Sequence, residues 1–65
     1  MRYEKWKDIV AISGSEGLKL IKELNDESLS GEWEGYRSSC LNIQYRVIYK
    51  IENEELYVKV FNLNP

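Results

Sequence analysis

The sequence contains no histidine, a single cysteine (Cys40) and a single proline, and it has no long apolar run. Histidine is the commonest general base near neutral pH and the commonest zinc ligand. Its absence, with only one thiol, excludes Ser-His and Cys-His catalysis and argues against a metal centre. One cysteine cannot form a disulfide within the chain. No segment approaches the roughly 18 apolar residues of a membrane span. The sequence therefore predicts a protein with no membrane span, metal or cofactor.

The remaining composition is that of one small domain. The chain has 65 residues, of which 43% are hydrophobic and 31% charged, so we predict a single domain over residues 1–65. A core this small has little stability to spare. Because neither a disulfide nor a metal site is expected to stabilise the fold, binding of a partner or self-association remains as the additional source of stability. One unpaired cysteine and a first segment without a signal peptide's apolar stretch favour the cytoplasm.

Charge is unevenly distributed along the chain. The net charge is −2, but Met1 to Glu34 carries five basic and eight acidic residues, whereas Gly35 to Ile51 carries three basic residues and no acidic one. Glu52 to Pro65 is acidic again, with one basic and three acidic residues. The middle of the chain is therefore a basic segment. Three like charges in such a stretch also arise often by chance, and both interpretations stay open at this point.

Residues 1–24 predict two helices. From Tyr3 to Ile12 the apolar residues recur at helical spacing, with charged residues on the opposite side. Gly14 is placed to end this helix, and Ser13 with Glu16 gives the S-x-x-E pattern that caps a following helix. We predict the second helix from Ser15 to Leu24. Its residues expected to face the core are Leu20, Ile21 and Leu24.

After Gly31 the apolar period changes to two, which is typical of strands. The clearest strand is Tyr45 to Ile51. A second, Leu56 to Leu63, follows a polar turn and forms a hairpin with it, and a weaker strand, Tyr36 to Leu41, precedes both. We therefore predict an α+β fold, with two N-terminal helices packed on one face of a three-stranded antiparallel sheet. Alternation places Arg46 on the face away from the core. The strand residues expected to be buried are Tyr45, Val47, Tyr49, Val58 and Val60.

Three stretches carry a family resemblance. They are Trp6 to Val10 (WKDIV, followed by Gly14), Leu29 to Leu41 (LSGEWEGYRSSCL) and Tyr45 to Tyr49 (YRVIY), and the chain closes with NLNP. In this order and spacing the stretches resemble the RelE/HigB-like branch of the RelE/ParE superfamily, the toxins of bacterial type II toxin-antitoxin systems. The resemblance covers almost the whole chain and implies a RelE-like α+β domain.

The resemblance also implies an activity, a set of partners and a site. Such toxins are ribosome-dependent mRNA endonucleases that work without metal or cofactor and are silenced by a cognate antitoxin. Cationic side chains hold the scissile phosphate and orient the ribose 2′-hydroxyl for in-line attack. Arg46 matches the arginine of the family's Y-R-V-I-Y strand, and Arg37 matches the basic residue that follows the aromatic Tyr36. The resemblance thus assigns catalysis to Arg46 and Arg37, and contacts with ribosome-bound mRNA to Tyr36, Asn42, Gln44 and Lys50.

The chain departs from the family pattern at Cys40, where close relatives carry arginine, and at both ends. Relatives begin with a further strand and continue past the N-x-N-P motif into a tail with an acid/base group, so we expect a RelE-like domain trimmed at both ends. The alternative function is a catalytically weak or inactive relative that binds an antitoxin or associates with itself. A gyrase-poisoning member of the superfamily is a third possibility. The side chains of Trp33 and Tyr36 are compatible with two locations, the border of a groove and the core.

Overall fold

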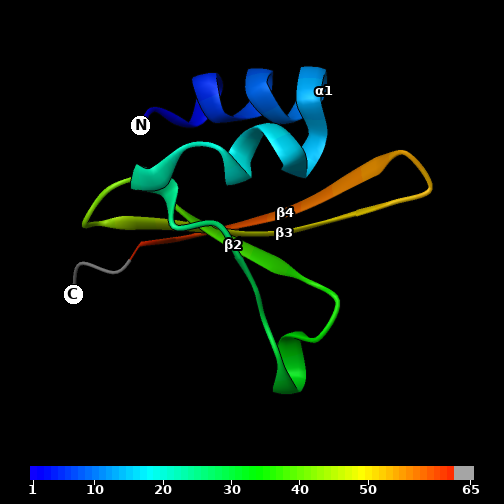
Figure 1. Ribbon diagram of the computed structural model, residues 1–65. Helices are drawn as coiled ribbons and strands as arrows, with labels where there is room; N and C mark the ends of the chain where they lie inside the picture. Colours follow the sequence, from blue (N-terminus) through cyan, green and yellow to red (C-terminus); the bar gives the residue numbers. More distant parts are fainter. Residues whose placement is uncertain (63–65) are drawn as a thin grey trace.

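The computed structural model describes residues 1–62 of the chain and has the predicted α+β fold. A helical layer lies on one face of an antiparallel sheet with the strand order β1-β2-β3-β4 (Figure 1). The sheet has four strands and not the predicted three, because two residues of the connection after the helices pair with β2. The elements, in chain order, are α1 (Tyr3–Lys19), η1 (Lys22–Leu24), β1 (Glu27–Ser28), η2 (Gly31–Trp33), β2 (Arg37–Cys40), β3 (Tyr45–Glu52) and β4 (Glu55–Asn62).

The helical layer is one element, α1, where the sequence predicts two helices. Gly14 interrupts it with φ 62° and ψ −159°, a conformation that only glycine adopts readily, so the helix is divided into arms 3–13 and 15–19. The chain reverses its direction at this break (Figure 1). The second arm ends at Lys19, short of the predicted Leu24. Leu20 is therefore outside the helix and exposed, contrary to prediction, whereas Leu24 is buried as predicted.

The β3–β4 hairpin is the largest piece of the sheet. Its pairing runs without interruption from Tyr45↔Asn62 to Glu52↔Glu55. Asn53 and Glu54 make the two-residue turn, both with positive φ (52° and 66°), as in the type I′ turn that matches the twist of the strands. The predicted hairpin is confirmed. The last predicted residue of its second strand, Leu63, lies outside the described residues, as do Asn64 and Pro65 of the NLNP motif.

The core lies between α1 and the middle of the sheet. Trp6 of α1 packs edge-on against Tyr49 of β3, with ring centroids 5.2 Å apart. Val47 and Tyr49 are fully buried as predicted, and Val58 is half-buried against them. The core residues are Trp6, Val10, Leu18, Leu24, Leu41, Val47 and Tyr49.

Two of the predicted core residues are exposed. Tyr45 and Val60 face the helical layer by register, but 37% and 47% of their respective surfaces remain accessible. These two side chains stay accessible because α1 packs mainly against Tyr49 of β3 and leaves the edge strand β4 largely uncovered. Among residues 1–62, no helix is long and apolar enough to cross a membrane.

Candidate functional site

The strand register divides the polar and aromatic side chains between two faces. Residues directly opposite each other in an antiparallel pair point to the same side of the sheet. Val47 and Tyr49 face α1, so the residues that alternate with them form the other face, which we call the open face. Its members on β2, β3 and β4 include Ser38, Cys40, Arg46, Ile48, Lys50, Tyr57, Lys59 and Phe61.

Arg46 lies on the open face beside a hollow of ≈ 320 Å³. Its Nη2 contacts Cys40 Sγ at 3.6 Å, and its Nε is buried with no hydrogen-bond partner in the described part of the chain. Sulfur is a weak acceptor, so the guanidinium is poorly satisfied by the protein. Glu27 lines the same hollow and reaches the open face through its pairing with Ser38. A strong donor and an exposed carboxylate therefore meet at one depression.

An aromatic group lies next to Arg46 on this face. Phe61 is paired directly with Arg46 across β3 and β4. Trp33, from η2, packs edge-to-face on Tyr36 and on Phe61, with centroid distances of 5.4 and 6.2 Å. The Nζ of Lys59 lies 5.6 Å from the centroid of the Trp33 ring. The η2 loop is thus held against the sheet by rings and by a cation.

Lys50 extends this group toward the hairpin turn. Its Nζ lies 5.1 Å from the centroid of Tyr36 and 5.6 Å from that of Tyr57. An ion pair with Glu52 at 3.1 Å raises the pKa of Lys50. Tyr36 and Lys50, both predicted RNA contacts, are therefore brought together. We call the whole group the aromatic–lysine cluster, formed by Trp33, Tyr36, Lys50, Tyr57, Lys59 and Phe61.

Arg37, the second predicted catalytic residue, lies on the opposite side of the sheet from Arg46. It pairs by register with Tyr49, and its Nε and Nη2 each lie 2.7 Å from Asp26 Oδ1. Burial lowers the pKa of Arg37, but the hydrogen bond and the charge of Asp26 outweigh that effect and raise it overall. The structure does not bring Arg37 and Arg46 together.

Asp26 is the centre of a buried polar network. Its side chain has no exposed surface. Besides Arg37, its Oδ2 accepts hydrogen bonds from Ser39 Oγ at 2.7 Å and from the Tyr49 hydroxyl at 2.5 Å. Burial first, and then the hydrogen bond to Asp26, raise the pKa of Tyr49. Four donor groups therefore converge on one carboxylate, which ties the loop before β1 to both β2 and β3.

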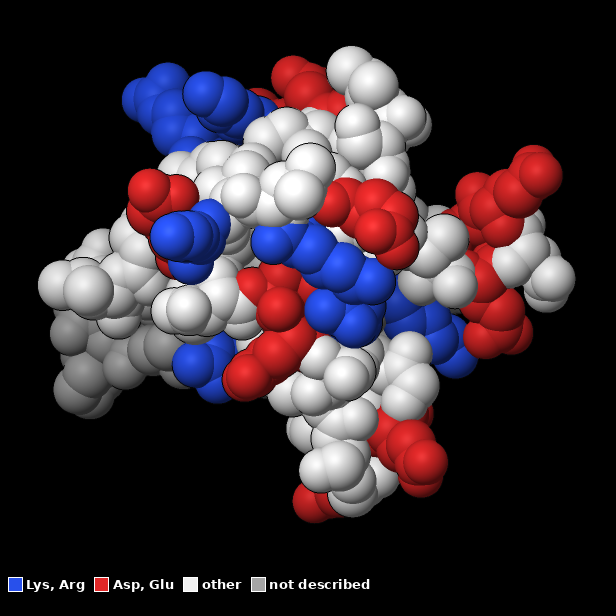
Figure 2. All heavy atoms as spheres, in the orientation of Figure 1, with Lys and Arg blue, Asp and Glu red and all other residues white. Residues whose placement is uncertain are grey.

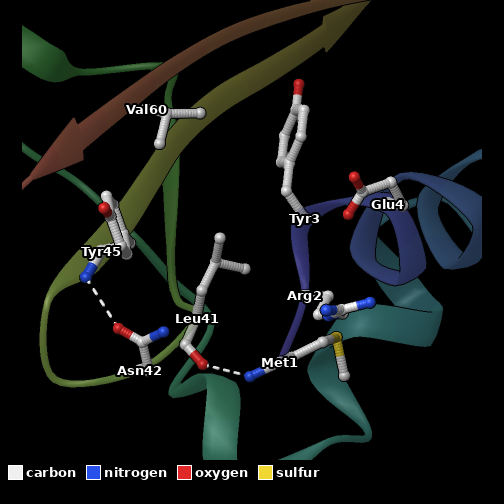
Figure 3. Close-up of a pocket in the computed structure, with 8 residues that line it drawn as sticks. All are labelled: Met1, Arg2, Tyr3, Glu4, Leu41, Asn42, Tyr45 and Val60. Carbon is white, nitrogen blue, oxygen red and sulfur yellow. Dashed lines mark hydrogen bonds between the residues drawn. The ribbon is translucent and has the colours of Figure 1, made fainter.

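Asn42 and Gln44, two further predicted RNA contacts, lie in the exposed turn between β2 and β3. Asn42 Oδ1 accepts hydrogen bonds from the backbone N–H groups of Gln44 and Tyr45, at 2.7 and 3.0 Å, so its side chain shapes the turn. Asn42 also lines a hollow of ≈ 530 Å³ that opens between Tyr45 and the start of the chain, where the amino group of Met1 donates to the Leu41 carbonyl (Figure 3). This hollow is separate from the one at Arg46.

The structure also separates the three cations of the basic segment. Arg37 is paired with Asp26 and Lys50 with Glu52, whereas no carboxylate of residues 1–62 pairs with Arg46. Acidic and basic side chains alternate over the side of the molecule shown in Figure 2. This side therefore carries no continuous positive surface, and Arg46 is the cation of the basic segment that lacks a described carboxylate partner.

Tyr57, Lys59, Phe61 and Glu27 are not among the site residues predicted from the sequence. Alternation along β4 places Tyr57, Lys59 and Phe61 on one face, and this pattern is present in the sequence. The pattern does not give the register between β4 and β3, so it could not show that Phe61 lies opposite Arg46. No group of three or more His, Cys, Asp or Glu side chains that could hold a metal ion occurs within the described residues. Comparisons of the chain with protein-family models, with curated proteins and with solved structures found no match.

Proposed function

We propose that this chain is a RelE-like toxin domain that cleaves ribosome-bound mRNA, and that Arg46 binds the scissile phosphate. The observation that carries the proposal is the state of Arg46. It is the cation of the basic segment that no described carboxylate neutralises, and it lies on the open face beside a hollow. A guanidinium stays charged at all physiological pH values and can bind a phosphate through two parallel N–H donors.

The chemistry that suits this site is attack by the ribose 2′-hydroxyl on the adjacent phosphate. The bond from O2′ to phosphorus forms and the bond from phosphorus to the 5′-oxygen breaks. The 2′-proton passes to a base, and the leaving 5′-oxygen takes a proton from water. Arg46 would stabilise the negative charge that develops on the phosphoryl oxygens. We assign the role of base to Glu27, because it is the exposed carboxylate that lines the hollow with Arg46.

The aromatic–lysine cluster would hold the RNA strand around the cleaved bond. Phe61 lies directly across from Arg46, and Trp33 and Tyr36 continue from it along the open face. Stacking of a base on an aromatic side chain contributes about 1–3 kcal/mol in proteins that bind single strands. Lys50 and Lys59, whose Nζ atoms lie over the rings of Tyr36 and Trp33, would contact the phosphates of the strand. A cognate antitoxin, as the resemblance implies, would silence the domain by covering this face.

Arg37 has a structural role in this proposal, since its guanidinium is engaged by Asp26 on the other face. The two arginines are therefore expected to differ in what their removal does. Loss of Arg46 should reduce cleavage and leave the fold unchanged. Loss of Arg37 should reduce the stability of the fold.

The test is mRNA cleavage in a bacterial translation extract, mapped by primer extension, with Arg46→Ala, Glu27→Gln and the matched control Arg2→Ala. Arg2 is exposed at the start of α1 and has the same charge as Arg46. We expect Arg46→Ala to lower the cleavage rate about 100-fold, which is typical for loss of one transition-state contact, and Arg2→Ala to leave it unchanged. Glu27→Gln should lower cleavage while RNA binding persists. Equal cleavage by Arg46→Ala and wild type, or none by wild type, would contradict the proposal.

A further inference from the structure

The outer edge of β4 from Glu55 to Phe61 is paired with no other strand of residues 1–62. β4 is the last strand in the order β1-β2-β3-β4, and β3 is its partner strand within the described part of the chain. Its side chains are accessible on both faces, with 38% of Leu56 and 47% of Val60 exposed on the helical side and 47% of Tyr57 exposed on the open face. The tip of the β3–β4 hairpin extends beyond α1 (Figure 1). β4 therefore presents backbone hydrogen-bonding groups next to apolar surface.

Devices that keep edge strands apart are scarce on β4. Natural edges are blunted by proline, by bulges, by shortness or by several charges. β4 has eight residues, no proline and an uninterrupted register with β3, and Lys59 is the one basic residue within it. An edge of this kind favours addition of another strand.

The hairpin turn determines which residues of β4 can pair outward. In a two-residue hairpin the flanking pair, here Glu52 and Glu55, exchanges both backbone hydrogen bonds, and bonded and non-bonded pairs then alternate. Residues 55, 57, 59 and 61 therefore direct their N–H and C=O groups to β3. Leu56, Val58 and Val60 direct theirs to the free edge.

We propose that the edge of β4 is a homodimer interface, at which β4 of a second copy pairs antiparallel about a two-fold axis through Tyr57. In such a symmetric pair the helices of both copies lie on the same side, and opposed residues must share a face. The two-fold axis must therefore pass through a pair of identical residues and cannot fall between two neighbouring residues. With the axis at Tyr57, Glu55 lies opposite Lys59 of the partner subunit, and the same contact occurs a second time by symmetry.

Charge complementarity selects this register over its neighbours. An axis at Lys59 would oppose two lysines, and an axis at Val58 would place Glu55 against Phe61 of the partner subunit. Opposite charges directly across a strand pair stabilise it and like charges destabilise it. The pairing would also extend the sheet beside two hollows of ≈ 530 and ≈ 510 Å³, into which Val60 and Leu56 respectively are exposed on the helical side. A second copy is thus the occupant whose charges and backbone groups match this edge.

Sedimentation of the wild-type chain at concentrations from about 1 to about 300 µM, which suit the weak affinity of a small interface, tests the association. We expect a reversible dimer. Charge reversal by Glu55→Lys or by Lys59→Glu should weaken it about 10-fold, since each creates two like-charge contacts, and the two substitutions together should restore wild-type affinity. Circular dichroism of each variant verifies the fold. A monomer at all concentrations, or a double variant as weak as the single ones, would overturn the proposal.

Disulfide trapping tests the position of the axis without changing a charge. In a Cys40→Ser background, Tyr57→Cys places two thiols across the axis at a non-hydrogen-bonded pair, where Cα atoms are about 4.5 Å apart and a disulfide can form on oxidation with diamide. Phe61→Cys is the matched control, on the same face of the same strand but far from the axis. We expect a covalent dimer for Tyr57→Cys alone. Trapping of Phe61→Cys instead, or of neither, would refute this register, and neither result depends on the proposed cleavage of RNA.

Discussion

Removal of the Asp26 carboxylate should be the most destabilising single change outside the apolar core. Asp26→Ala leaves the Arg37 guanidinium and the hydroxyls of Ser39 and Tyr49 without their common acceptor, at a side chain with no exposed surface. Breaking a buried ion pair by removing one partner costs about 3–5 kcal/mol. A domain of this length has a total stability of about 3–10 kcal/mol. We expect a loss of about 4 kcal/mol, so the variant is partly or fully unfolded near 37 °C.

Urea denaturation followed by circular dichroism measures this loss. Asp8→Ala is the control, because Asp8 is an exposed carboxylate on α1 and its removal should change the stability by less than about 0.5 kcal/mol. Arg37→Ala alone should also destabilise, and the double variant of Asp26 and Arg37 should lose at least 1 kcal/mol less than the sum of the single losses, since the two groups interact directly. Additive losses, or an Asp26→Ala variant as stable as Asp8→Ala, would refute the buried network.

Three further predictions concern stability. The pKa of Tyr49 is raised by burial and by Asp26, so the unfolded chain loses this proton first and stability should fall above about pH 10, by up to ~1.4 kcal/mol per pH unit, in urea titrations of wild type but less in Tyr49→Phe. Gly17→Ala should destabilise by about 1–3 kcal/mol despite alanine's helix propensity, because a Cβ there would lie 2.6 Å from Ser13 Cβ; an unchanged melting temperature would contradict this packing. Glu54→Gly should raise the melting temperature, since it gives Asn53-Gly at a turn position with φ 66°, and a lower value would argue against the type I′ turn.

The parts of the fold that could be predicted from sequence are those that a local pattern determines. Alternation over β3 identified Val47 and Tyr49 as core residues, and Gly14 was the predicted position of the helix break. Tyr45 has the same pattern as Val47 but is exposed, because periodicity shows which face a side chain occupies and not how far the helix extends over that face. β1 was missed for a related reason, since two residues are too few to show a period.

The candidate site was predictable in part. Arg46 and Lys50 were correctly placed on one face by alternation along a single strand. Arg37 matches the basic position of the family that the sequence resembles. Its place on the opposite face follows from its pairing with Tyr49, which depends on the register between two strands. The role of Asp26 was not visible at all. It lies in a polar connection that resembles a solvated loop, and only the folded chain shows that three side chains from two strands, β2 and β3, donate to it.

The position of Asp26 along the chain has a consequence for the order of folding. Its partners Arg37, Ser39 and Tyr49 are 11, 13 and 23 residues away. No local turn can form these bonds, and β2 and β3 must already lie side by side before the donors converge. Closing such loops costs chain entropy that is recovered only when the acceptor arrives. We therefore expect the hairpins to form early in folding. The segment at residue 26 should pack against them late, as the step that completes the domain.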